Sequence, residues 1–372
     1  MRTRVSELFG IDFPIFAFSH CRDVVAAVSR AGGLGVFGAL AFSNDQLQVE
    51  LDWIDAHIDG KPYGVDVVMP NSLAEMGGLD KAAFEAMIPQ RHRDFVEEVL
   101  DRHRVPKLPD GVMPFESLLA WTHSGARSQV EIALSHPIKL LVNALGTPPK
   151  DVIDQVHARG VQVAALCGSV EHALRHVEAG IDIIVAQGSE AGGHTGEIGT
   201  MVLIPDVVDA VAPRPVLAAG GIGSGRQIAA ALALGAEGAW MGSVWLTTAE
   251  SDLHPVAREK LLRATSRDTV RSRSMTGKPA RQLRTAWTEA WDDPSSPGAL
   301  AMPLQFMLTS DAISRIHRYA HVESSGAKEL VGSPVGQIVG RMKSVRPVRE
   351  IVYEMMDEFV DAMSRVTALL EE

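Results

Sequence analysis

The chain has 372 residues, of which 46% are hydrophobic and 22% are charged, so its composition is that of a globular protein and not of a disordered one. Its 46 acidic and 35 basic residues give a formal net charge of −11, which disfavours a general binder of nucleic acid or of anionic membranes. Its two cysteines offer neither a disulfide framework nor metal-ligand spacing, so we expect a cytoplasmic protein without a bound metal.

One apolar stretch is long enough to suggest a membrane span. Residues 227–249 contain a single charge, Glu237. Gly235 and Gly238 divide the stretch into a helix of about eight residues and a strand of about six residues, which is a common α/β pattern. The N-terminus also lacks a signal-peptide pattern, because acidic residues interrupt it. We therefore expect no membrane span and no export signal.

Strand-like and helix-like segments alternate along the first two-thirds of the chain. Short apolar runs typical of buried strands cover residues 13–19, 32–40, 63–69, 138–144, 161–166, 181–186, 216–219 and 238–244. Helical patterns cover residues 23–31, 44–58, 128–134, 150–158, 170–178, 205–211 and 225–234. Eight strands with helices between them in about 250 residues predict an α/β fold, a (β/α)₈ TIM barrel, with a doubly wound open sheet as the alternative.

Two regions depart from this alternation. Residues 71–125 interrupt it after the third strand with a charged helical pattern over 87–103 and a proline-rich loop. An insertion of this size forms a lid, part of a substrate pocket or a plain surface elaboration. Beyond residue 253 the helical patterns cover 254–263, 285–291, 327–330, 337–342 and 348–370, with a Pro/Ser/Gly linker at 294–303. We predict a barrel domain over 1–253 and a helical appendage over 254–372 that packs on it.

Glycines follow the seventh and eighth predicted strands, where a TIM barrel usually binds phosphate. The first loop begins with Gly220 and Gly221, and the second contains Met241, Gly242 and Ser243. Glycines let backbone N–H groups approach an anion, and a following helix adds its positive N-terminal end. One such loop alone is more often only a tight turn, but two after consecutive strands favour a phosphate site.

The loop after the sixth strand places an imidazole beside this predicted phosphate site. His194 lies there among glycines and can act as an acid or a base, because imidazole titrates near neutrality. The alternative is an ordinary surface histidine. Glu190, in the same loop, either orients His194 or caps the next helix.

Two further groups have residue types that suit catalysis or ligand binding. His20 and Cys21 have the residue types of a base and a nucleophile, but adjacent residues on an extended chain point in opposite directions, so we expect no catalytic pair. Residues 263–284 are rich in arginine. This segment either binds a phosphorylated co-substrate or the nucleotide tail of a thioester, or it is a solvated basic face.

The string AQGSEAGGHTG at residues 186–196 resembles the signature of the nitronate monooxygenase (2-nitropropane dioxygenase-like) family. Residues 218–222 and 235–243 resemble the family's phosphate loops, and weaker matches lie at 31–35, 62–66 and 277–281. The resemblance covers residues 13–285 and implies a flavin-binding TIM barrel with one FMN.

The resemblance also implies a role for individual residues. His194 is expected to be the catalytic base. Residues expected to contact FMN are Asp66, Gln187, Gly192 and Gly193 around the flavin and Gly220, Gly221, Trp240, Met241, Gly242 and Ser243 around its phosphate and ribityl chain. Asp66 replaces an asparagine that is usual in the family, and a carboxylate there would disfavour an anionic reduced flavin. The family's Ala-Pro-Met stretch is also replaced, by residues 17–21, so the substrate side of the flavin is expected to differ.

The reaction that the resemblance implies is oxidation of nitroalkanes, or of their nitronate anions, by molecular oxygen. An NAD(P)H-dependent reductase of an enoyl thioester or a quinone is the alternative on the same scaffold. A non-catalytic phosphate or nucleotide sensor is the alternative from another class. In each case the expected partner is a small molecule and neither nucleic acid nor a membrane, and the sequence leaves the oligomeric state open.

Overall fold

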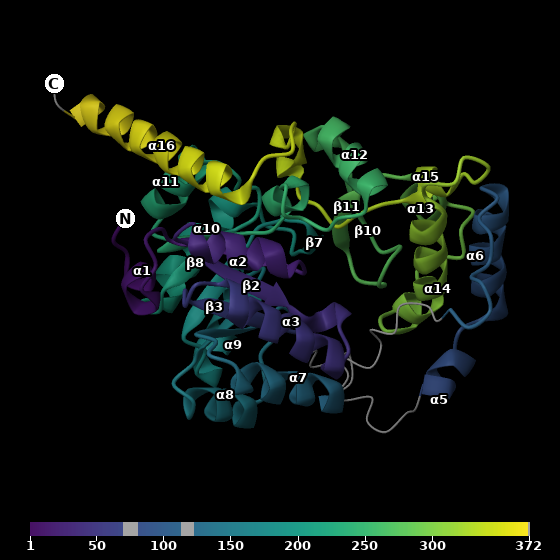
Figure 1. The fold of residues 1–372 in the computed structure, drawn as a ribbon, viewed down its shortest axis with the longest axis horizontal. Helices are drawn as coiled ribbons and strands as arrows, with labels where there is room; N and C mark the ends of the chain where they lie inside the picture. Colours follow the sequence, from purple (N-terminus) through teal and green to yellow (C-terminus); the bar gives the residue numbers. More distant parts are fainter. Residues whose placement is uncertain (70–80, 113–122, 371–372) are drawn as a thin grey trace.

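The structure, a computed structural model, describes residues 1–69, 81–112 and 123–370. Eight parallel strands close into a barrel in the order β1-β2-β3-β4-β5-β6-β8-β9. Helices cover the outside of this barrel (Figure 1). The barrel strands are β1 (Ile15–Ser19), β2 (Leu34–Gly38), β3 (Tyr63–Val67), β4 (Leu140–Asn143), β5 (Gln162–Cys167), β6 (Ile183–Gln187), β8 (Val216–Ala219) and β9 (Gly238–Met241). The helices around them are α2 (Arg22–Arg30), α3 (Asn44–His57), α7 (His123–Ser135), α8 (Lys150–His157), α9 (Val170–Ala179), α10 (Thr200–Val211) and α11 (Gly225–Ala233). The predicted (β/α)₈ TIM barrel is confirmed.

Alternate residues of each strand fill two separate layers of the barrel. In β1, Phe16 belongs to the cluster inside the barrel, whereas Ile15 and Ala17 belong to the larger cluster between strands and helices. Parallel strands buried on both faces therefore appear in the sequence as continuous apolar runs. A helix that the sequence analysis did not predict, α1 (Arg4–Phe9), adds Val5 and Phe9 to the inner cluster.

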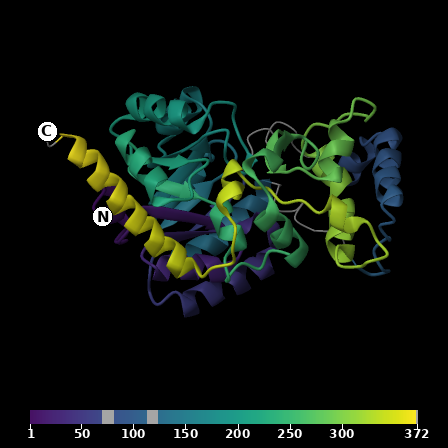
Figure 2. The same ribbon diagram turned by 90° about the horizontal axis from the view of Figure 1, so that it is seen from above.

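A second lobe lies beside the barrel and is built from two distant parts of the chain (Figure 2). The inserted region supplies α5 (Lys81–Ala86) and α6 (Gln90–Arg102), and the later region supplies α12 (Pro255–Arg263), α13 (Ala286–Asp292), α14 (Leu304–Tyr319) and α15 (Ala327–Leu330). Leu100 of α6, Trp291 of α13 and Ile316 of α14 share one hydrophobic cluster. The predicted helix at 87–103 is confirmed by α6, while much of the rest of the predicted insertion, at 71–80 and 113–122, lies outside the described residues.

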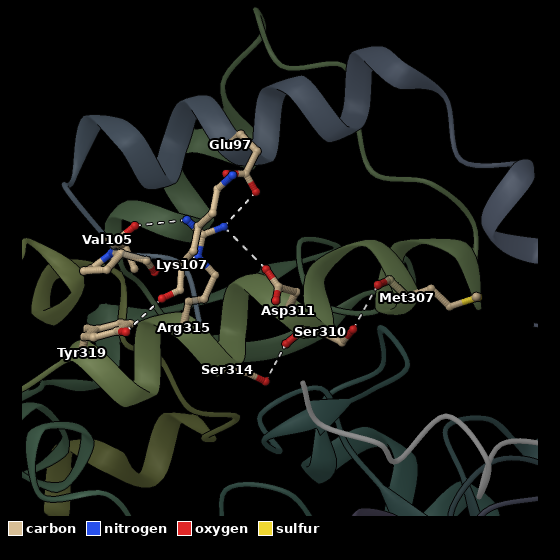
Figure 3. Close-up of polar contacts among 10 residues, drawn as sticks. Glu97, Val105, Lys107, Met307, Ser310, Asp311, Ser314, Arg315 and Tyr319 are labelled. Atoms are coloured by element: carbon tan, nitrogen blue, oxygen red, sulfur yellow. Dashed lines mark hydrogen bonds and ion pairs between the residues drawn. The ribbon is translucent and has the colours of Figure 1, made fainter. Parts of the chain in front are cut away.

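Within this lobe, a buried arginine of α14 binds the inserted segment (Figure 3). Arg315 is 2% exposed, and its guanidinium donates to the backbone oxygens of Pro106 at 2.9 Å and Val105 at 3.1 Å. The same group forms ion pairs with Glu97 at 2.8 Å and Asp311 at 3.5 Å. The guanidinium therefore satisfies two carbonyls that would otherwise lack a donor at the end of α6.

The C-terminal region divides between the two cores. Its last long helix, α16 (Val348–Thr367), packs along the barrel against α11 and α2 (Figures 1 and 2). Val352 and Met355 of α16 belong to the outer barrel cluster, and the amide of Gly225 donates to Glu358 Oε2 at 2.8 Å. Short 3₁₀ helices lie at η1 (Ala39–Ala41), η3 (Ser243–Thr247), η4 (Ser266–Asp268), η5 (Gln337–Arg341) and η6 (Ala368–Leu370). The domain boundary at 253/254 thus remains a prediction.

Within the described residues, no helix is long and apolar enough to cross a bilayer.

Candidate active site

A small antiparallel sheet positions His194. The sheet has the order β10-β11-β7, with β10 (Thr269–Ser272), β11 (Ala280–Leu283) and β7 (Gly193–His194). His194 pairs with Ala280, and Gly193 pairs with Arg281. These strands are too short to give a recognisable pattern in the sequence, since β7 has only two residues and β10 and β11 have four each. The sheet connects the loop after β6 to the basic segment 263–284.

Two arginines of the basic segment hold the His194 loop by its backbone. Arg281 Nε donates to Ser189 O at 2.8 Å, and Arg271 donates to Thr195 O at 3.4 Å. The two arginines lie directly opposite each other on β10 and β11, a like-charge pairing that is unfavourable unless acceptors offset it. Burial and the charge of Arg271 lower the pKa of Arg281. The segment is therefore not simply a solvated basic face, since part of it anchors the predicted catalytic loop.

His194 is held in its neutral form. Its Nε2 lies 2.8 Å from Thr276 Oγ1, in the loop that connects β10 to β11. Burial, and then the charge of Lys278, lower the pKa of His194 to about 4. A neutral imidazole carries the lone pair that a general base needs. His194 is thus in the protonation state that its predicted role requires at neutral pH.

Helix α14 supports the loop that carries Thr276. Gln305 Nε2 donates to Ser274 O at 2.9 Å, and Thr309 Oγ1 donates to Met275 O at 2.9 Å. Both side chains are fully buried, so these hydrogen bonds do not exchange readily with water. The second lobe therefore determines where the hydrogen-bond partner of His194 lies.

Glu190 caps α10. Its carboxylate accepts hydrogen bonds from Thr200 N at 2.9 Å and from Thr200 Oγ1 at 2.8 Å. The residue at the N-cap position, Gly199, has no side chain to do this. The capping interpretation of Glu190 is confirmed. The predicted start of this helix at residue 205 is wrong, because a cap supplied from outside the helix allows it to begin at Thr200.

The loops after β8 and β9 offer free backbone donors. Gly220 and Gly221 have φ angles of +101° and +69°, which favour glycine, and a Cβ at Gly220 would lie 2.8 Å from Thr200 Oγ1. Among the described residues, the amides of Gly221, Gly242 and Ser243 donate to no protein acceptor. Unpaired amides at the ends of neighbouring strands suit an anion such as phosphate.

The side chains of Trp240 and Met241 lie on opposite faces of β9. Trp240 belongs to the cluster inside the barrel, and its ring stacks with Phe18 at a centroid distance of 6.2 Å. Met241 belongs to the outer cluster, so its side chain faces the surrounding helices. A contact between Met241 and a ligand in the barrel mouth would have to use its main chain.

Asp66 and Gln187 lie near the ends of β3 and β6. Asp66 is 3% exposed, and its Oδ1 has no hydrogen-bond partner. Burial raises the pKa of Asp66 well above its usual value, so this carboxyl is held neutral. The unfavourable effect that a carboxylate would have on an anionic flavin does not apply to a neutral carboxyl. An orphaned polar atom at this position suits a bound ligand. Gln187 alternates with the inward-facing Val185 and ends β6 partly exposed.

His20 and Cys21 do not form a pair, as expected. Cys21 Sγ donates to Glu250 O at 3.2 Å, and burial raises the pKa of this thiol. His20 Nδ1 instead lies 2.8 Å from Gly38 O on β2.

The sequence marked residues 263–284 as a possible binder of a co-substrate, but it did not predict that four residues of this segment act on the His194 loop. They are Arg271, Thr276, Lys278 and Arg281. Their side chains act on the His194 loop from a segment that follows it by about 80 residues, as the separation of 82 between His194 and Thr276 shows. The sequence held one indication of this contact, since Thr276 directly precedes residues 277–281, which weakly resemble the family.

Comparisons with known proteins show the family and the fold. The family model described as nitronate monooxygenase matches residues 2–358. A Mycobacterium tuberculosis protein that carries a provisional monooxygenase name is 54% identical, and the alignment covers 100% of both chains. Among solved structures, nitroalkane oxidase from Streptomyces ansochromogenes superimposes with a TM-score of 0.78 at 26% identity, covering 97% of this chain and 99% of that one. FabK from Thermotoga maritima has a TM-score of 0.73 at 29% identity and covers 99% of each chain.

Proposed function

The chain belongs to the nitronate monooxygenase family of oxidoreductases, and from this premise we propose that it is an FMN-dependent enzyme that oxidises nitroalkanes, or their nitronate anions, with molecular oxygen. The observation that carries the proposal is the neutral imidazole of His194, held 2.8 Å from Thr276 in the loop after β6, the strand next to the two whose following loops have free backbone amides. The solved nitroalkane oxidase that resembles this chain supports the same substrate class.

The residues present fit FMN. The amides of Gly221, Gly242 and Ser243 would hold its phosphate, and Trp240, Met241 and Gly220 belong to the same two strand ends. Gln187, Gly192, Gly193 and Asp66 would lie around the flavin ring, where the neutral carboxyl of Asp66 can donate or accept a hydrogen bond. When bound, the flavin supplies the electron acceptor for the substrate.

His194 would remove the α-proton of a neutral nitroalkane. The proton passes to the imidazole, and the electron pair of the broken C–H bond moves onto the nitro group, which becomes a nitronate. The ammonium of Lys278, close enough to lower the pKa of His194, would stabilise the negative charge that develops there. Thr276 would keep the imidazole in place during this step.

The substitution His194→Asn tests this role. We expect the turnover of a neutral nitroalkane to fall by about 10²- to 10⁴-fold, the usual contribution of a general base. Turnover of a nitronate prepared in advance should change much less, because its proton is already gone. FMN content, measured by absorbance, should be retained. His172→Asn on the exposed face of α9 is the matched control, and undiminished nitroalkane turnover in His194→Asn would remove the residue from this role.

One observation favours a second reaction, an NAD(P)H-dependent reduction of an enoyl thioester or a quinone. The basic side chains of Arg271, Arg281 and Lys278 near His194 suit a phosphorylated co-substrate. Anaerobic mixing of the FMN-loaded protein with NADH or NADPH separates the two reactions. Prompt bleaching of the flavin supports the reductase, and a flavin that stays oxidised until a nitronate is added supports the oxidation.

A further inference from the structure

The histidine that follows β1 lies on the inner side of the barrel mouth. Phe16 and Phe18 of β1 face the inner cluster, and strand alternation places His20 on the same side. His20 Nδ1 lies 2.8 Å from Gly38 O, and a Cβ added to Gly38 would lie 2.6 Å from the same nitrogen. Gly38 alternates with the inward-facing Val36, so the imidazole lies over the inner face of the end of β2.

The hydrogen bond to Gly38 fixes the tautomer of His20. A carbonyl oxygen can only accept, so Nδ1 carries the hydrogen and Nε2 keeps a lone pair. Among the described residues, no donor reaches Nε2. Within the part of the chain that the structure describes, His20 therefore presents a fixed hydrogen-bond acceptor that no protein donor occupies.

His20 is both accessible and crowded. Its ring is exposed to solvent, yet burial by surrounding protein lowers the pKa of His20, which the Gly38 carbonyl and the nearby charge of Asp252 only partly counteract. His20 is therefore neutral at physiological pH. Asp66 of the next strand lies on the same inner side of the barrel, because it pairs in register with Gly38, and burial raises the pKa of its carboxyl.

His20 lies closer to the mouth of the barrel than the aromatic pair that precedes it. Phe18 stacks on Trp240, and the rings of His20 and Phe18 meet at a steep angle with a centroid distance of 5.1 Å. Because β1 runs toward the mouth, His20 lies on the side of this pair from which a substrate would enter. An alkyl chain beside Nε2 would leave the acceptor unpaired at a cost, and a carboxylate would place negative charge against its lone pair.

We propose that His20 determines substrate specificity, and that Nε2 accepts a hydrogen bond from a hydroxyl group on the nitroalkane or nitronate. The preferred substrate class is then the hydroxyl-bearing nitro compounds and not the plain alkyl ones. This inference rests on the proposed function.

Two substrates of equal size test the inference. 2-Nitroethanol and 1-nitropropane differ by a hydroxyl in place of a methyl group, and both are supplied to the FMN-loaded enzyme as nitronates. We expect kcat/KM to favour the hydroxyl compound, and His20→Leu to lower this preference by about two- to twelvefold, the range for loss of one neutral hydrogen bond. The dissociation constants of both nitronates, measured anaerobically from the flavin spectrum, should show the same change. His172→Gln is the surface control.

A second variant keeps the imidazole but displaces it. Gly38→Ala is compatible with the backbone, because φ at Gly38 is −80°, but its Cβ would collide with His20 Nδ1. We expect Gly38→Ala to reduce the preference for the hydroxyl compound as His20→Leu does. An unchanged preference in both variants would overturn the inference, as would a loss of FMN affinity without a change in preference, which would assign His20 to the cofactor.

The two proposals fail in different ways. If neither nitronate is oxidised by the unmodified enzyme, the proposed function is wrong. The ratio of the two dissociation constants would still show whether His20 selects for a hydroxyl group. If both nitronates are oxidised with equal efficiency, the proposed function stands and the role of His20 is wrong.

Discussion

The imidazole of His194 is surrounded by protein and lies near the ammonium of Lys278, and both effects lower its pKa, to about 4. Such a base is unprotonated throughout the neutral range but is a weak proton acceptor. A bound anion would act in the opposite direction and raise the pKa of His194. The site is therefore suited to a base that becomes stronger only when an anionic ligand is present.

Removal of the charge at Lys278 should shift to higher pH the acid limb of the pH profile, the point at which kcat/KM falls on acidification. In Lys278→Met the imidazolium form of His194 loses a repulsive neighbour, so the pKa of His194 rises above about 4 and protonation inactivates the base at a higher pH. We expect kcat/KM for a neutral nitroalkane to begin its fall at higher pH in this variant than in the unmodified enzyme. Lys61→Met, on the exposed surface, should leave the limb in place. An acid limb that stays fixed or moves to lower pH contradicts the assignment.

The sequence indicates the candidate site residues that lie next to glycines after a strand, but not the contacts that other segments make with them. His194 and the Gly220 and Gly242 loops follow strands in the places where a barrel binds ligands. Thr276 reaches His194 only because a hairpin 82 residues later folds back onto the loop. The neutrality of Asp66 depends on its burial, which no local pattern shows.

Helix α14 shows why one long element was not predicted. Its buried face includes Gln305, Thr309 and Arg315, which bind backbone carbonyls of other segments. Polar residues on the buried face weaken the hydrophobic periodicity on which helix prediction depends. The helices of the barrel were predicted at positions that overlap those observed, although α7 and α10 each begin five residues earlier than predicted.

Helix α10 depends on a cap that comes from another part of the chain. Glu190→Ala removes the acceptor of Thr200 N and Oγ1 and a negative charge near the positive end of the helix. We expect the free energy of unfolding to fall by about 1 kcal/mol, the usual value for loss of an N-cap. Denaturant unfolding of the apoprotein at neutral pH measures this change. Glu131→Ala, exposed on α7, is the control, and equal stability in both variants would contradict the capping role.

The molecule has a core in the barrel and a core in the second lobe, and the chain segments that build them alternate along the sequence. The second lobe combines α6 with α12 to α15, whereas α16 returns to the barrel. A sequence read in order shows where the alternation of strands and helices stops, but not which later segment packs with an insertion. The two regions join because their apolar faces share one cluster, and Arg315 fixes their relative positions.

Arg315→Met should loosen the second lobe while the barrel stays intact. Methionine preserves part of the apolar stem but leaves the oxygens of Pro106 and Val105 without a donor, whereas Glu97 and Asp311 remain partly exposed to water. We expect local destabilisation of roughly 3 kcal/mol, because each buried carbonyl left without a donor costs about 1–3 kcal/mol. Hydrogen exchange should accelerate in α6 and α14 but not in the barrel strands. Arg318→Met, exposed on the same helix, is the control.

The same substitution should reach the active site through α14. Gln305 and Thr309 of this helix hold the loop that carries Thr276, so a looser α14 weakens the constraint on His194. We expect Arg315→Met to reduce turnover of a neutral nitroalkane more than turnover of a preformed nitronate, because only the first reaction needs the base. Faster exchange spread evenly over both cores would show instead that the protein unfolds as one unit and that Arg315 does not act on the second lobe alone.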